Sequence, residues 1–237
     1  MGIIAKLISS ILNKATIVYK AQLTPNTYHI RLQGEVLKQA NYVPGYFIRI
    51  FVGKGKDLAF EDNIRSYSVW QLDKTAGTLD MAISVHSDGS GSAWAKECHV
   101  GDEVAFGWHK GNFIVDDTAD DYLFIGDLSA LGHLYEINRH LPKGKRTQSI
   151  IYDAHTADFF PDIDGTRPFT FYNCNGDQVL SKVPALISSF SANSITYIGG
   201  DSRVCVTIHN YLRRELKWDT RRIKAKPFWN PLKKGLE

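Results

Sequence analysis

Cysteine is scarce in this sequence of 237 residues, which contains only Cys98, Cys174 and Cys205. They are odd in number, far apart, and form no CxxC pair. This argues against a disulfide framework and a zinc site, so we expect no metal centre and a reducing compartment. Long apolar runs are also lacking, and none approaches the length needed to span a bilayer. We therefore expect a cytoplasmic protein that does not span a membrane.

The segment Met1–Leu12 is the stretch that most resembles an export signal. Its apolar residues recur at helical spacing, Lys6 interrupts them, and no small-residue cleavage site follows. The pattern predicts an amphipathic helix packed on the body of the protein rather than a signal peptide.

Charge of one sign does not dominate the chain, whose formal net charge is +3, but residues 211–237 contain nine Lys or Arg against three acids. Such a block can bind nucleic acid, acidic lipid or a small anion, or it can form a solvated surface. The aromatic residues near it are Tyr211, Trp218, Phe228 and Trp229. They are spaced like core positions rather than like a base-stacking platform, so we expect no nucleic-acid partner.

The first half of the chain is a series of short β-branched or aromatic runs separated by turn residues. The predicted strands are Ala15–Gln22, Tyr28–Leu32, Tyr46–Val52, Ser66–Leu72, Thr78–His86 and Glu103–Trp108, and Gly89–Cys98 is predicted to be a turn that enters a short helix. Six short strands at this spacing favour a small antiparallel barrel.

After Phe113 strands alternate with helices. The predicted strands are Tyr122–Ile125, Gln148–Tyr152, Phe169–Tyr172 and Ile195–Ile198, and the predicted helices are Leu128–Leu141, Gln178–Phe190 and Ser202–Leu216. This alternation predicts a parallel sheet covered on both faces. The acidic run Asp116–Asp121 marks the boundary, which gives a β-barrel domain over 1–115 and an α/β domain with a basic tail over 116–237.

Two motifs of the first half suit a phosphorylated, flat ligand. In the strand that begins Arg65-Ser66-Tyr67-Ser68, alternation places Arg65 and Tyr67 on one face, where a guanidinium can bind a phosphate and a phenol can contact a ring. Glycines at 89 and 91 permit a close backbone approach, and the helix that follows offers unpaired N–H groups to a pyrophosphate, with Ser92 as a further donor.

With these motifs in this order, the chain resembles the siderophore-interacting proteins of the ferredoxin–NADP reductase superfamily. The resemblance is carried by Arg65–Ser68 as the flavin-binding RxY(S/T), Pro44–Phe47, His86–Ala95 followed by Val100–Asp102, Gly126–Leu131, Gly199–Asp201 and the closing Phe228-Trp229. It implies an FAD-binding barrel and a nicotinamide-binding α/β domain. The residues implied to bind cofactor are Arg65, Ser66, Tyr67, Ser68, His86, Gly89, Gly91, Ser92, Ala93, Trp94, Gly126, Asp127, Gly200, Asp201 and Trp229.

The second half lacks one feature of many dinucleotide-binding domains, the G-x-G-x-x-G fingerprint. The Glu-Thr that the family has after Gly-Asp is Leu128-Ser129 here. The electron donor, whether NADH, NADPH or a ferredoxin, is therefore open, as is a structural α/β half with altered nucleotide use. Arg203 is a candidate for a 2′-phosphate contact or an ordinary helix-surface charge.

The resemblance implies a cytoplasmic, monomeric, FAD-dependent enzyme that reduces ferric siderophores and releases Fe(II). No catalytic residue beyond the flavin is expected. Four lysines are candidates for an anionic substrate: Lys54, Lys56, Lys224 and Lys226. The alternatives are a general flavin-dependent electron-transfer reductase and a protein that binds a flavin or an iron chelate without turnover.

Overall fold

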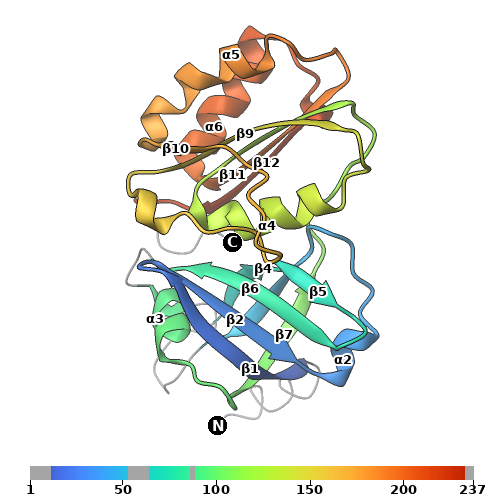
Figure 1. The fold of residues 1–237 in the computed structure, drawn as a ribbon, viewed down its shortest axis with the longest axis vertical. Coiled ribbons are helices and arrows are strands. Elements are labelled where there is room, and N and C mark those ends of the chain that lie inside the picture. The colour runs from blue at the N-terminus through green and yellow to red at the C-terminus, as the bar shows by residue number, and fades with distance from the viewer. Residues whose placement is uncertain (1–11, 53–63, 86–88, 233–237) are drawn as a thin grey trace. The chain divides into compact units, whose positions relative to one another are not determined.

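The computed structural model describes residues 12–52, 64–85 and 89–232. The chain divides into two compact units, unit 1 (Met1–Gly111) and unit 2 (Asn112–Leu236). The division falls a few residues before the acidic run at 116–121. Figure 1 shows one unit made mainly of strands and one unit of strands and helices, and each is described by itself.

Unit 1 is an antiparallel sheet, as the sequence predicted, and it has seven strands where six were expected. Its strands, in spatial order, are β4 (Ile64–Ser68), β3 (Phe47–Phe51), β7 (Glu103–His109), β1 (Asn13–Thr24), β2 (Thr27–Gln33), β6 (Thr78–Ser84) and β5 (Gln71–Asp73). Two helices accompany it among the residues described, α2 (Glu35–Lys38) and α3 (Ser90–Glu97).

The two edges of this sheet are consecutive in the chain. β4 and β5 lie at opposite edges but are separated only by Val69 and Trp70, and the Trp70 N–H donates to the Asp80 carbonyl of β6 at 2.8 Å. The single strand predicted over 66–72 is therefore wrong. The chain leaves one edge at Ser68 and joins the other at Gln71, so it carries the sheet round into a barrel-like form, although no ladder joins β4 to β5 among the described residues.

Alternation along the strands separates core from surface in unit 1. On β2, Ile30 and Leu32 are fully buried while Gln33 is exposed. The interior is built mainly from aliphatic side chains, and it also contains Tyr67 and the fully buried Phe106. α3 packs on this core through Ala95, and Trp94 lies at its margin.

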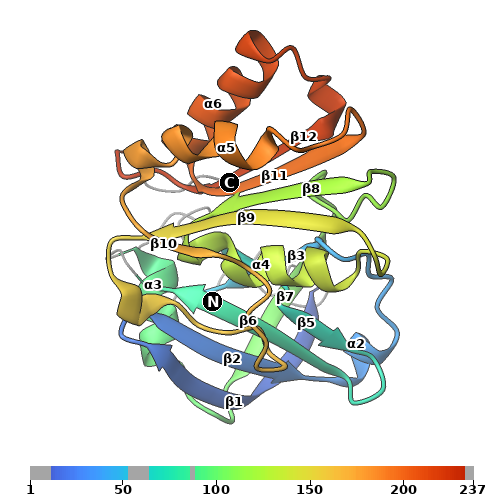
Figure 2. The ribbon, with the colours of Figure 1, turned by 45° about the horizontal axis from the view of Figure 1, so that its top comes forward.

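Unit 2 is a parallel sheet, again as predicted, and β12 adds a fifth strand to the four that were expected. Its spatial order is β10 (Phe171–Asn173), β9 (Arg146–Asp153), β8 (Asp121–Gly126), β11 (Ser194–Asp201) and β12 (Ile223–Trp229). β8 and β11 are buried at every position, as continuous apolar strands of a covered parallel sheet are. α4 (Leu128–Arg139) covers one face, and α5 (Val183–Ile187) and α6 (Ser202–Asn210) cover the other (Figure 2).

Two predicted helices of unit 2 are interrupted. The helix expected over 178–190 consists of the short 3-10 turns η3 (Gly176–Gln178) and η4 (Leu180–Lys182) and then α5. Pro184 explains the break, because proline is accepted only in the first turn of a helix. The helix expected over 202–216 ends at Asn210 and continues as a π-helical turn, η5 (Tyr211–Glu215). Further 3-10 turns are η2 (Thr156–Asp158) and η6 (Thr220–Arg222).

The three cysteines are buried free thiols. Burial raises the pKa of the Cys205 thiol to about 12, which makes it a poor nucleophile. Within 12–52, 64–85 and 89–232, no His, Cys, Asp and Glu side chains are grouped as a metal site, and no helix is both long and apolar enough to cross a bilayer.

Candidate functional site

In unit 1, strand β4 and helix α3 meet at Gly91. The Tyr67 hydroxyl donates to the Gly91 carbonyl at 3.1 Å, and the Tyr67 and Trp94 rings lie 5.3 Å apart. A Cβ placed on Gly91 would be 3.0 Å from the Tyr67 hydroxyl and 3.4 Å from Arg65 Cγ. Arg65 and Tyr67 therefore share one face of β4 and both reach this glycine, as strand alternation predicts.

The first turn of α3 is suited to an anion. Gly89 is its N-cap and supplies no side-chain cap, and the turn contains no acidic residue. Its backbone N–H groups carry the positive end of the helix dipole, and the half-buried Arg65 adds a fixed cation beside them. Ser92 is buried, and Ala93 is exposed. The residues present thus fit the pyrophosphate of a dinucleotide such as FAD.

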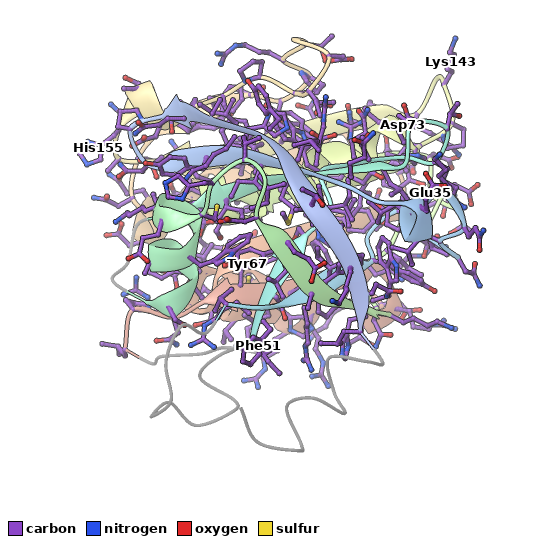
Figure 3. The ribbon with its side chains drawn as sticks, turned by 90° about the horizontal axis from the view of Figure 1, so that it is seen from below. Glu35, Phe51, Tyr67, Asp73, Lys143 and His155 are labelled. Carbon is purple, nitrogen blue, oxygen red and sulfur yellow. The ribbon has the colours of Figure 1, made fainter. Side chains whose placement is uncertain are left out.

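Tyr67 is more enclosed than the sequence indicated. It is 9% exposed and belongs to the core of unit 1, with Trp94 against its ring. Figure 3 shows it among the strands, whereas Phe51, 41% exposed, lies at their rim. The Tyr67 ring is thus held in place by protein contacts. Ser66 and Ser68 point from the opposite face of β4 and are half-buried.

Three residues of the expected site, Lys54, Lys56 and His86, lie outside the described residues.

In unit 2, the carboxyl ends of three strands meet around one carboxylate. Asp127 follows β8 and is the N-cap of α4, where it accepts hydrogen bonds from the N–H and the hydroxyl of Ser129. It also accepts from the Asp201 N–H at 2.7 Å and from Trp229 Nε1 at 2.8 Å. The structure therefore brings Asp127, Asp201 and Trp229 together, and we call these residues with Ser129 the Asp127 cluster.

The glycines beside this cluster are required by close packing. Gly200 has φ +109°, and a Cβ there would lie 2.3 Å from Asp127 Oδ2. A Cβ on Gly199 would lie 2.8 Å from the Ala130 Cβ, and one on Gly126 would lie 2.7 Å from Leu134 Cδ1. The backbone at the ends of β8 and β11 can approach α4 only because these side chains are absent.

The four donors leave Asp127 little capacity for a ligand, since each is a protein group and the residue is only 6% exposed. Asp201 is occupied as well. Its carboxylate caps α6 through the Arg203 N–H and pairs with Arg203 Nη2 at 2.6 Å. Arg203 is 61% exposed, so its guanidinium reaches solvent while it remains paired.

A buried tyrosine near this edge was not singled out from the sequence. Tyr152 near the end of β9 is 5% exposed, and its hydroxyl has no hydrogen-bond partner in the part of the chain that the structure describes. Burial raises its pKa, and the nearby Asp127 and Asp201 raise it further. No sequence pattern distinguishes it, because a tyrosine in a parallel strand is usually a core residue.

The lysines of β12 are not free charges. Lys224 Nζ lies 3.1 Å from Asp116 Oδ2, and Lys226 Nζ lies 5.3 Å from the centre of the Phe228 ring. Both lysines are half-buried while Ala225 between them is exposed, so they share one face of the strand.

The two units together have the architecture of the ferredoxin–NADP reductases, an antiparallel flavin-binding sheet followed by a parallel α/β sheet. Residues 59–112 match the sequence profile of the siderophore-interacting FAD-binding domain, and residues 119–231 match that of the siderophore-interacting protein. The chain belongs to the siderophore-interacting protein family.

Solved structures support this fold. The siderophore-interacting protein SipS from Aeromonas hydrophila is 21% identical, with a TM-score of 0.77 over 94% of this chain and 92% of that one. A siderophore utilization protein from T. fusca is 19% identical, with a TM-score of 0.75 over 95% of both chains. Ferredoxin-NADP+ reductase from Plasmodium falciparum is 15% identical, with a TM-score of 0.70 over 92% of this chain and 97% of that one. No curated protein sequence matches the chain significantly.

Proposed function

We propose that the chain is an FAD-dependent reductase of ferric siderophores, which passes electrons from NAD(P)H or a ferredoxin to Fe(III) and so releases Fe(II). The observation that carries the proposal is the convergence of Arg65, Tyr67 and Gly91 at the uncapped start of α3. The match of residues 59–112 to a siderophore-interacting FAD-binding domain supports it.

In this proposal unit 1 holds the cofactor. Arg65 and the first-turn N–H groups of α3 bind the pyrophosphate, and Gly91 allows its close approach. Tyr67, fixed by its bond to Gly91, borders the flavin together with Trp94. Ser66, Ser68 and His86 are assigned as further contacts. Bound FAD supplies the conversion of a two-electron donor into single electrons.

Unit 2 is proposed to receive the nicotinamide donor at the carboxyl ends of its strands, where ligands of α/β sheets bind. The Asp127 carboxylate is already engaged by protein donors, and the G-x-G-x-x-G fingerprint is absent. We therefore expect slow reduction by NADH or NADPH with a high KM, and a ferredoxin remains an alternative donor.

The iron chelate is the substrate. Oxygen ligands that bind Fe(III) tightly hold Fe(II) less strongly, because Fe(II) is larger and less charged, so one-electron reduction promotes release. Lys54, Lys56, Lys224 and Lys226 are the proposed contacts for an anionic chelate. Because Lys224 is paired with Asp116, its contribution is expected to be smaller than that of a free lysine.

The first test is the colour of the purified protein and its anaerobic bleaching. Retained FAD gives the flavin absorption bands, NADH or NADPH should bleach them, and added ferric siderophore should restore them as an Fe(II) indicator develops. Bleaching without Fe(II) would favour a general electron-transfer reductase. Bound flavin that no donor bleaches would favour a binding protein, and a colourless protein that binds no added FAD would contradict the proposal.

The second test concerns Arg65. Arg65→Ala removes a charge-assisted contact of about 1.5–3 kcal/mol, so FAD affinity should fall by roughly ten- to hundredfold. Lys74→Ala, which removes a cation from an exposed turn of the same unit, is the matched control and should leave affinity unchanged. Equal FAD affinity in Arg65→Ala and the parent would show that Arg65 does not bind the cofactor.

The proposal includes a monomer in the cytoplasm. Free, buried thiols suit a reducing compartment. Gel filtration with light scattering tests the monomer, and a mass near twice 26.7 kDa would contradict it.

A further inference from the structure

Unit 2 contains a pocket at the amino ends of its parallel strands. It has a volume of about 740 Å³ and lies where β11 begins at Ser194 and where the chain approaches β12 at Arg222. β11 rises by about 3.3 Å per residue, so its start lies roughly 23 Å from its end at Asp201, beside the Asp127 cluster. The pocket therefore shares no residue with the cofactor-binding residues assigned above.

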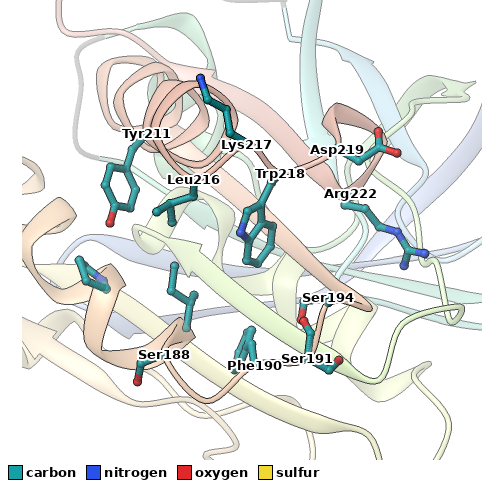
Figure 4. A pocket seen from close by; sticks show the side chains of 13 residues that line it. Ser188, Phe190, Ser191, Ser194, Tyr211, Leu216, Lys217, Trp218, Asp219 and Arg222 are labelled. Carbon is teal, nitrogen blue, oxygen red and sulfur yellow. The ribbon is translucent and has the colours of Figure 1, made fainter.

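Aromatic and aliphatic side chains form two opposing walls of this pocket. Figure 4 shows Tyr211, Leu216 and Trp218 on one side, facing Phe190 and Ser188 on the other. Tyr211, Trp218 and Phe190 are all partly buried on the core of unit 2, which fixes their rings. Such walls suit a flat aromatic group, and the volume is within the usual range for a small-molecule site.

The wall formed by Tyr211, Leu216 and Trp218 depends on an unusual chain path. After the π-helical turn, Lys217 has φ +58°, a left-handed conformation that side chains other than glycine seldom adopt. The Trp218 N–H then donates back to the Leu212 carbonyl at 3.0 Å. This turn fixes the backbone at Trp218, whose indole lines the pocket. π-helical turns and left-handed residues of this kind occur often at binding sites.

The charges that line the pocket favour an anion. Lys217 and Arg222 have no ion-pair partner in the described ranges, and Arg222 Nη1 is buried without a hydrogen bond there. The one lining acid, Asp219, already forms a bidentate pair with Arg221, whose hydrogen bonds lower the pKa of Asp219 to about 2. Figure 4 shows the Lys217 ammonium pointing away from Phe190, so Arg222 is the lining cation that remains for a ligand.

The serines add limited hydrogen-bonding capacity. Ser188 and Ser194 donate their hydroxyl protons to the carbonyls of Ala185 and Ser191. The Ser191 hydroxyl accepts from the Asn193 N–H at 3.2 Å and donates its own proton to the Asp121 carboxylate, whose pKa this hydrogen bond lowers. The hydroxyls of all three serines are therefore already bonded to protein groups, and Arg222 is left to bind an anion.

We propose that this pocket is a second ligand site of the protein, which binds a flat aromatic molecule that carries a carboxylate or another single anionic group. The ring lies between Trp218 and Phe190, and the anion binds Arg222. The site is separate from the cofactor and nucleotide sites, so it can be occupied independently of them.

The probe is 2-naphthoate, and its neutral counterpart is 2-naphthalenemethanol. From the affinity per atom typical of small ligands, we expect 2-naphthoate to bind the parent with a Kd of about 0.1–1 mM. The alcohol should bind about tenfold more weakly, because it cannot use Arg222. Calorimetry measures both, with ligand-observed NMR as a check.

The location is tested through the indole N–H signals of the five tryptophans. Trp218→Phe removes and so assigns one signal, which should move when 2-naphthoate is added to the parent. The Trp229 indole, bonded to Asp127 at the other end of the sheet, should not move. A shift of Trp229 without Trp218, or no binding at 5 mM probe (on the order of a few Kd), would overturn the proposal.

Two variants test the charge. Arg222→Gln should weaken 2-naphthoate binding about tenfold or more and leave the alcohol unaffected. Arg214→Gln, an equal loss of charge on an exposed residue of the π-helical turn outside the pocket, is the control and should bind like the parent. Circular dichroism confirms folding, and FAD content should be unchanged in both. Parent-like binding of 2-naphthoate by Arg222→Gln would show that no anion site exists there.

Discussion

Single residues in this protein are constrained most strongly where the backbone of β11 touches the Asp127 carboxylate. Gly200 combines a positive φ with a Cβ position only 2.3 Å from Asp127 Oδ2, whereas Gly101, with φ +99°, has no atom within 4 Å of an added Cβ among the described residues. The pair separates two effects that are usually mixed, backbone strain and steric overlap.

Gly101→Ala should lower the free energy of unfolding by about 1–2 kcal/mol, since it introduces backbone strain alone. Gly200→Ala should cost at least about 3 kcal/mol, since Asp127 must also move away from its four donors. Urea unfolding of both variants measures the difference. Equal losses of unfolding free energy in the two variants would mean that the Asp127 cluster rearranges around the added methyl group without an energetic cost.

Asp127 itself gives a second prediction at this scale. Asp127→Asn places an amide donor among four donors, so at least one buried group loses its acceptor, at a cost of about 1–3 kcal/mol. The loss should appear in the thermal midpoint, and Trp229 fluorescence should change as its indole N–H is released. Ser129→Ala, which removes only the hydroxyl donor, is the milder control. An unchanged midpoint in Asp127→Asn would contradict the assigned hydrogen bonds.

At the scale of elements, Asp121 joins the amino ends of neighbouring strands. It begins β8, pairs with Arg146 at the start of β9, and accepts from the N–H of Ser191 ahead of β11 at 2.7 Å. The hydrogen bond from Arg146 is the main reason that the pKa of Asp121 is held well below its usual range.

A depressed carboxyl pKa stabilises the fold above the unfolded value of about 3.9, and this contribution is lost as pH falls toward the folded value. Asp121→Asn should therefore be about 1.5–3 kcal/mol less stable than the parent at pH 7, and the gap should narrow below about pH 4. Asp120→Asn, at an exposed carboxylate, should change stability by less than about 0.5 kcal/mol. A stability difference between Asp121→Asn and the parent that stays constant down to pH 3 would show that the ionised Asp121 carboxylate does not stabilise the fold.

The α4 face of unit 2 contains a histidine that responds to pH differently. His133 is fully buried, its Nε2 donates to the Phe113 carbonyl at 2.9 Å, and burial, aided by Lys226, lowers its pKa to about 3. The side chain is therefore neutral in the folded protein at ordinary pH.

For the whole molecule, the lowered pKa of His133 predicts a loss of stability in mild acid. Between pH 6.5 and 3 the unfolded chain binds a proton at His133 that the folded protein does not, so stability falls with decreasing pH by up to about 1.4 kcal/mol per unit. His133→Gln should remove this part of the slope between pH 6.5 and 4.5, and the exposed His99→Gln should not. Identical slopes in both variants would contradict a buried neutral His133.

The sequence predicted the features that depend on local pattern. Short strands separated by turn residues predicted the antiparallel sheet, and strands alternating with helices predicted the parallel sheet. The alternation of side chains along a strand placed Arg65 and Tyr67 on one face. Features that depend on residues far apart in the chain could not be predicted from the sequence. The four donors of Asp127 come from three separate segments, and the pocket at Trp218 depends on a left-handed Lys217 that no residue preference suggests. Pro184 was a local signal, and its effect on the predicted helix was overlooked.

The position of β7 in the sheet of unit 1 has a consequence for synthesis on the ribosome. β7 is the last strand of the unit in the chain, yet it lies between β3 and β1 and pairs with both. Until Glu103–His109 has emerged, β3 and β4 have no hydrogen-bonded connection to β1, although β4 leads directly into β5 at the far edge. The nascent chain therefore exposes unpaired strand edges until β7 inserts, which makes this the interval in which it most needs protection from aggregation.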